Sequence, residues 1–154
     1  MSESVLELIA ENIKDTVNGI TEAAGYSQTL VATRPSPVDI ANETWEDLTV
    51  WINQAEAEEL DSAHGTKEWR QFFLLVVFFV NSNTDVNPVD SRCNKVFADI
   101  ITELMKDHTR DGNANYTDIH SATFYDVNDE GTVGMAVKIS IDYRTKFEDP
   151  YTRV

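Results

Sequence analysis

The end of the chain contains the feature that most constrains its fold, because apolar residues occupy every second position over a long stretch. The members of this series are Val133, Met135, Val137, Ile139, Ile141 and Tyr143. A period of two predicts a β-strand that places one face against a hydrophobic core. The tail that follows, residues 144–154, contains aromatic and charged side chains but too few apolar ones to fold alone. We therefore expect this tail to contact another molecule and to serve in assembly.

Composition limits the class of protein. With 154 residues, of which 42% are hydrophobic, residues 1–154 are expected to form a single globular domain. A formal net charge of -15 repels phosphates and anionic headgroups, so a nucleic-acid reader or a membrane-surface protein is a poor candidate. The single cysteine, Cys93, cannot form an internal disulfide, and the first residues contain no apolar signal segment. The longest apolar run, residues 72–80, is shorter than the roughly 20 residues of a membrane helix. We expect a soluble protein, cytoplasmic at synthesis, with no membrane partner.

Two amphipathic helices are predicted. The first covers residues 2–24, where Ser4 and Glu7 have the spacing of a capping box and Gly25 ends the helix. The second begins at Pro88, because a helix accepts proline at its first position, and ends at residues 111–112. Both place apolar side chains at steps of three and four, which indicates one buried face each. These side chains are Val5, Ile9, Ile13, Val17, Ile20 and Ala24 in the first helix, and Val89, Cys93, Val96, Phe97, Ile100, Leu104 and Met105 in the second.

The remaining segments are predicted strands and their connections. Strands are expected at residues 26–33, 48–52, 69–80, 119–127 and 132–143. Two prolines predict a loop over residues 34–39, and turn-forming residues predict turns at residues 81–87 and 128–131. Residues 56–68 are acidic and contain the pair His64-Gly65, which predicts an exposed, mobile loop. The order α-β-β-β-α-β-β predicts an α+β fold, a mostly antiparallel sheet of about five strands with two helices packed on it.

The sequence contains no recognisable reaction chemistry. His64, His108 and His120 are widely separated and lack zinc-site spacing, so each is expected at the surface. Cys93 lies on the apolar face of the second helix and is expected to be a core thiol. Residues 126–131 match the start of a calcium loop, but Val137 stands where the bidentate glutamate is needed. We expect no catalytic residue, no cofactor-binding residue and no metal ligand, and therefore no enzyme.

Acidic residues line the first helix opposite its apolar face. They are Glu3, Glu7, Glu11 and Asp15, at successive i, i+4 positions. Like charges at this spacing destabilise a helix by about 0.2 to 0.5 kcal/mol per pair. Two interpretations stay open: a solvated face, or a surface that meets a basic partner.

Several segments together resemble a known family. They are residues 24–26 at the end of the first helix, residues 96–104 in the second helix, residues 141–145 at the end of the last strand, and residues 149–152. With the proline-containing loop and the apolar strand between them, they resemble, in order over nearly the whole chain, the tail-terminator or tail-completion proteins of long-tailed bacteriophages.

The resemblance implies a structural virion protein. A homohexameric ring would cap the finished tail tube, which is built from the tail tube protein. The neck or head-completion protein would dock on the ring. DNA would be only passing cargo in the lumen, and the location would be the tail or neck of the virion after assembly in the host cytoplasm. The resemblance implies no catalytic residues. A net charge of -15 suits such a conduit, because an acidic wall does not bind phosphates.

A ring requires a heterologous interface, in which two different surfaces of one subunit meet. The acidic stripe of the first helix and the basic end of the chain are a candidate pair. The predicted interface residues are Glu3, Glu7, Glu11, Asp15, Arg144, Lys146, Phe147, Asp149, Tyr151 and Arg153.

Other functions stay open. The leading alternative is a small acidic protein-binding or regulatory domain, whose Phe and Tyr tail recognises one partner. Another neck or tail subunit, a stopper or a tube subunit, has the same expected composition. An enzyme with a carboxylate site that follows no known motif is a third alternative.

Overall fold

The computed structural model describes residues 3–42, 46–80, 88–127 and 131–154. Its helices are α1 (Val5–Asn18), α2 (Pro37–Ala41) and α3 (Val89–Lys106), with a 3-10 turn at Glu22–Ala24. Its strands are β1 (Val31–Thr33), β2 (Thr49–Ala63), β3 (Thr66–Val80), β4 (Tyr116–Asp126), β5 (Thr132–Lys146) and β6 (Asp149–Arg153). The predicted α+β fold is confirmed. The predicted turns at residues 81–87 and 128–130 lie outside the described residues.

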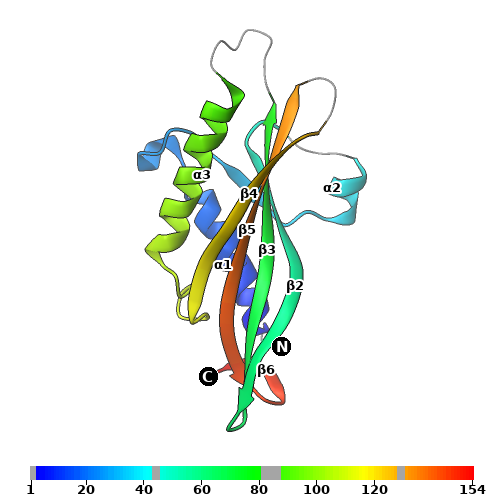
Figure 1. Cartoon of the computed structure of the whole chain (residues 1–154), viewed down its shortest axis with the longest axis vertical. Coiled ribbons are helices and arrows are strands. Elements are labelled where there is room, and N and C mark those ends of the chain that lie inside the picture. Colours follow the sequence, from blue (N-terminus) through cyan, green and yellow to red (C-terminus); the bar gives the residue numbers. More distant parts are fainter. Residues whose placement is uncertain (1–2, 43–45, 81–87, 128–130) are drawn as a thin grey trace.

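The sheet has the order β1-β2-β3-β5-β4, and β6 pairs with β5. Only the pairing of β1 with β2 is parallel among the described strands, and the other four pairings are antiparallel. β5 pairs along its whole length with β3 and is therefore central. Figure 1 shows β2 and α2 on one side of the sheet and α3 with β4 on the other.

The hydrophobic core lies between one face of this sheet and the two long helices. α1 contributes Val5, Ile9 and Ile13, and α3 contributes Val96 and Ile100, all fully buried or nearly so. The alternating series predicted for β5 faces these helices, and its members from Met135 to Tyr143 belong to the same cluster. β3 adds Phe73, Leu75, Val77 and Phe79 at every second position. The helical and strand periods therefore meet in one buried layer.

Both long helices are shorter than predicted. α1 ends at Asn18, whose side chain accepts a hydrogen bond from Ala32 N at 2.8 Å and donates one to Ala32 O at 3.1 Å. This pair of bonds connects the end of the helix to β1. Ile20 follows the helix and is still buried in the core. α3 begins one residue after Pro88 and ends at Lys106. The buried guanidinium of Arg110 donates to the carbonyls of Leu104 and Asp107, which would otherwise be orphaned at the helix end.

The prediction that residues 34–39 contain no helix is wrong. α2 begins there with Pro37 in its first turn, where proline is tolerated because no intrahelical N–H bond is lost. Ser36 is the N-cap, and its hydroxyl accepts from Asp39 N at 3.2 Å while Asp39 accepts from Ser36 N at 2.8 Å. This reciprocal capping box stabilises a short helix despite two prolines.

The prediction of a mobile acidic loop at residues 56–68 is also wrong. These residues complete β2 and begin β3, and the two strands pair down to Ala63 and Thr66. His64 and Gly65 have φ of 53° and 78°, which is the left-handed conformation of a tight two-residue hairpin turn. The predicted solvent exposure of residues 56–63 is confirmed, but these residues form a strand and not a loop.

The chain end also differs from the prediction. The sheet was expected to be complete at Tyr143, but β5 continues to Lys146 and the chain then reverses into β6. β6 occupies the side of β5 that β4 leaves uncovered beyond Asp142. It also contacts α1. Pro150 is compatible with this strand because β6 lies at an edge, where a missing N–H costs little.

Candidate functional site at the two edges of the sheet

One edge of the sheet is formed by β1 and β2. β1 pairs with β2 only from Thr49 to Trp51. Within the described chain, no strand covers the outer side of β2 beyond Gln54, so residues 55–63, named here the acidic arm, have an open backbone edge. Its exposed carboxylates are Glu56, Glu58, Glu59 and Asp61.

A buried glutamine holds the start of the acidic arm. The register of β2 against β3 jumps between Gln54 and Ala57, which leaves a bulge. Gln71 of β3 is only 3% exposed, and its Nε2 donates to the carbonyls of Ala55 at 2.9 Å and Glu56 at 3.2 Å. The amide thus replaces ladder hydrogen bonds that a bulge loses.

The acidic arm has more negative charge than its neighbours neutralise. Lys138 binds Glu56 at 3.1 Å, and this hydrogen bond lowers the pKa of the Glu56 carboxyl. Lys67 lies 3.7 Å from Glu59. Glu58 and Asp61 form no ion pair with any described residue. These two carboxylates are available to a basic partner.

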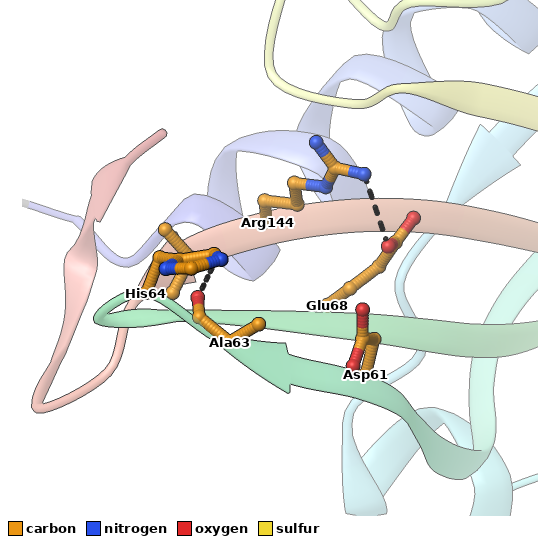
Figure 2. Close-up of a pocket in the computed structure, with 6 residues that line it drawn as sticks. Asp61, Ala63, His64, Glu68 and Arg144 are labelled. Atoms are coloured by element: carbon orange, nitrogen blue, oxygen red, sulfur yellow. Dashed lines mark hydrogen bonds and ion pairs between the residues drawn. The ribbon is translucent and has the colours of Figure 1, made fainter.

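A polar hollow of 210 Å³ lies beside the hairpin turn (Figure 2). Asp61, His64, Glu68 and Arg144 line it, and Arg144 binds Glu68 at 3.2 Å across the β3–β5 pair. The predicted interface residue Arg144 therefore already has a partner in its own chain. In this hollow the one cation among the described residues, Arg144, is already bound to Glu68. No described lining side chain that could act as a nucleophile is hydrogen-bonded to a lining base.

The same edge also carries an exposed apolar helix. α2 has no buried residue, and Val38 and Ile40 are 64% and 54% exposed. Val31 of β1 is similarly exposed. Exposed apolar side chains on both β1 and α2 make this edge a candidate contact surface.

The opposite edge contains an apolar groove. α3 and β4 enclose a groove of 330 Å³, whose apolar lining residues are Phe97, Ile101, Met105 and Ile119. Asp118, His120 and Ser121 of β4 form its polar rim. Met105 and Phe97 were predicted to belong to the buried face of the helix, but Met105 is exposed and Phe97 is half-buried.

The C-terminal segment, defined as residues 146–154, lies on this second edge because β6 is on the β4 side of β5. Phe147 and Tyr151 are each 50% exposed. The ammonium of Lys67 lies 4.9 Å from the centre of the Phe147 ring. Lys146 and Arg153 form no ion pair with any described residue.

The predicted acidic stripe on α1 is partly neutralised within the chain. Arg34 binds both Glu7 and Glu11, at 2.8 Å for Glu11. The hydrogen bond from Arg34 lowers the pKa of Glu7, and hydrogen bonds from Lys14 and Arg34 lower that of Glu11. Glu3 and Asp15 are exposed.

Of the other predicted interface residues, Asp149, Tyr151 and Arg153 belong to β6, which contacts α1. Asp149 accepts hydrogen bonds from Thr152 Oγ1 at 2.5 Å and from Tyr151 N at 3.0 Å, which lower the pKa of its carboxyl. Since α1 and β6 contact each other in one chain, the stripe and the C-terminal segment are neighbouring surfaces. Their pairing between subunits stays a prediction.

Residues with catalytic potential are not brought together. Cys93 is buried, and burial raises the pKa of its thiol. His120 lies 2.7 Å from the Ser140 hydroxyl, but only as a cross-strand pair without a carboxylate in the contact. In the described ranges, no three His, Cys, Asp or Glu side chains are grouped so as to hold a metal ion. The helices of the same ranges include none long and apolar enough to span a membrane.

Sequence reasoning missed three of these surfaces. The open edge of β2 was missed because its residues were predicted to form a loop. α2 was missed because two prolines were taken to exclude a helix. The groove depends on packing between α3 and β4, which are separate elements of the chain. The Ser36-to-Asp39 spacing before an apolar pair was the one local signal for α2. Comparisons of the sequence with protein-family models and with curated proteins find no match.

Proposed function

We propose that the chain is a structural virion protein, a bacteriophage tail terminator that forms a homohexameric ring. The ring caps the tail tube and joins the tail to the neck, in the virion and, during assembly, in the host cytoplasm. Its partners are further copies of itself, the tail tube protein and a neck protein, with DNA as cargo in the lumen.

The observation that carries the proposal is the unlike character of the two sheet edges. The β1–β2 edge projects the apolar side chains Val38 and Ile40 on a short helix, and the β4 edge contains an apolar groove. A projecting surface on one edge and a recess on the other favour head-to-tail contacts, which generate a ring when the rotation closes. A self-complementary dimer would need the same patch on both partners.

The charge distribution supports the passage of DNA. The subunit has a net charge of -15, and eight of its 12 basic side chains are bound to carboxylates, so the wall of a lumen built from it is acidic. A duplex that meets such a wall releases few counterions, because few free cations replace them. Transit without binding is what a tail conduit requires.

Electron microscopy of the purified chain tests the proposal. We expect rings with a central opening, and capped tubes of limited length when the chain is added to polymerising tail tube protein from the same genome. Ile40→Asp and Met105→Asp should each abolish rings while the fold survives, because both side chains are exposed. Leu8→Asp, an exposed position on α1, is the matched control and should leave rings intact.

The alternative function makes a different prediction in the same experiment. A small protein-binding domain stays monomeric at all concentrations and leaves tubes uncapped. Rings that stack into tubes of their own would instead favour a tube subunit.

A further inference from the structure

Basic side chains without an ion pair are scarce in the described chain, and two of the three lie in the C-terminal segment, which also contains Glu148 and Asp149. The chain has 12 Lys and Arg residues against 27 Asp and Glu. Eight of the basic side chains form ion pairs, and Arg110 is buried. Only Lys95, Lys146 and Arg153 are exposed and without an ion pair to described residues. Two of these three belong to the C-terminal segment, beside the half-exposed rings of Phe147 and Tyr151.

Unpaired negative charge is present on the acidic arm. Glu58 and Asp61 are exposed there, and Leu60 between them is 39% exposed. The arm also keeps an open backbone edge, which an added strand or loop can use for hydrogen bonds. A partner of the arm therefore needs basic side chains with apolar surface between them. The C-terminal segment has both.

Within the described chain, Glu58 and Asp61 form no ion pair with Lys146 or Arg153, so these charges are available for pairing between chains. The arm lies outside β2, and β6 lies on the far side of β3 and β5, so the sheet separates them. Both lie at the same end of the molecule (Figure 1), where Phe147 N donates to Gly65 O of the hairpin turn at 2.7 Å. A head-to-tail contact joins two different surfaces of one subunit, and the arm and the C-terminal segment are two such surfaces.

We propose that the acidic arm of each subunit docks on the C-terminal segment of its neighbour, so that Glu58 and Asp61 face Lys146 and Arg153. This inference rests on the proposed ring and names one contact between its neighbouring subunits. Opposite charges at such a contact set specificity and orientation as well as affinity. The α1 stripe then stays solvated, with Glu7 and Glu11 bound by Arg34.

Charge reversal tests the contact. The arm variant carries Glu58→Lys and Asp61→Lys, and the tail variant carries Lys146→Glu and Arg153→Glu. Each alone places like charges at every contact, so we expect monomers by native mass spectrometry at concentrations where the wild-type chain is fully assembled. Lys95→Glu changes a free cation outside the contact and should assemble like the wild type.

Rescue distinguishes a direct contact from a folding defect. A chain with all four reversals restores opposite charges and should form rings again. An equal mixture of the arm and tail variants should also form rings, in which the two variants alternate, because each variant's arm then meets an opposite charge on its neighbour. Thermal unfolding of each purified variant checks that it is folded.

Two results would overturn the contact while leaving the ring intact: rings formed by either reversed variant alone, or failure of both rescues in folded chains. A wild-type chain that stays monomeric overturns the proposed function together with this inference. Raising the salt concentration should weaken wild-type rings, because screening acts on these exposed charges. Rings equally stable at low and high salt would contradict the charge-based contact.

Discussion

Gln71 allows the attachment of the acidic arm to be tested by one substitution. Its buried amide bridges the bulge that separates the arm from the covered part of β2. Nε2 donates to Ala55 O, Glu56 O and, at 2.9 Å, Phe72 O. Gln71→Leu keeps a side chain of similar size but removes the donor. The carbonyls of Ala55 and Glu56 then lose the one side-chain donor that they have among the described residues.

The structure sets the size of the effect. Nε2 has two hydrogens for three acceptors, so no more than two full hydrogen bonds are lost. At about 0.5 to 1.5 kcal/mol each, Gln71→Leu should lower the free energy of unfolding by about 1 to 3 kcal/mol. For a chain of this length, each kcal/mol corresponds to a decrease of about 2 to 4 °C in the melting temperature. Glu56 is exposed, so water can satisfy its carbonyl and favour the lower half of the range.

Urea unfolding followed by circular dichroism measures the stability change, and an unchanged m-value shows that the unfolded surface is the same. Asn53→Leu is the control, because the Asn53 amide donates one long bond of 3.4 Å to Trp51 O. Hydrogen exchange adds a local readout. Amides of residues 57–63 should exchange faster in Gln71→Leu than in the control.

A Gln71→Leu chain that unfolds within about 0.5 kcal/mol of wild type, and whose acidic arm exchanges at the wild-type rate, would show that Gln71 does not hold the bulge. A global loss of stability without faster exchange in the arm would show that Gln71 supports the core and not the bulge.

Three further changes have defined outcomes. Gly134→Ala should destabilise by about 1 to 3 kcal/mol, since the new Cβ would lie 2.4 Å from Tyr125 Cζ. In a Tyr125→Ala background the same change should stabilise the chain by about 0.5 to 1 kcal/mol. A change in melting temperature of the same sign in both backgrounds would contradict this. Arg34→Ala removes the cation that lowers the pKa of Glu7 below its ordinary value of 4.5, so its stability difference from wild type should be present above that pH and shrink in acid. A difference in urea midpoint that is constant from neutral to acidic pH would argue against that pair. Deletion of residues 147–154 should leave a cooperatively folded monomer without rings, and either an unfolded chain or intact rings would exclude the assembly role.

The fold was predictable where burial on one face leaves a period in the sequence. β5, α1 and α3 each show such a period, and β3 is a long apolar run. The acidic arm shows no such period in the sequence, because both of its faces are exposed. Its pairing with β3 is set by a hairpin turn and a bulge. β6 was missed for a related reason. Its two register pairs with β5 and its contact with α1 are long-range features that residues 147–154 alone do not encode.

The candidate surfaces were predictable only in part. The aromatic and basic character of the chain end is visible in the sequence, and the structure places Phe147 and Tyr151 half-exposed at a sheet edge. The acidic stripe of α1 was visible too, but its neutralisation by Arg34 depends on a loop far along the chain. The complementary features of the opposite edge, α2 and the open side of β2, follow from tertiary structure.

The central claim is that unlike edges of the sheet join copies of this chain into a closed ring. Native mass spectrometry over a wide concentration range, with electron microscopy of the same sample, tests it most directly. We expect one closed species of six copies with a central opening. Monomers throughout the range, or a twofold dimer as the largest species, would contradict it.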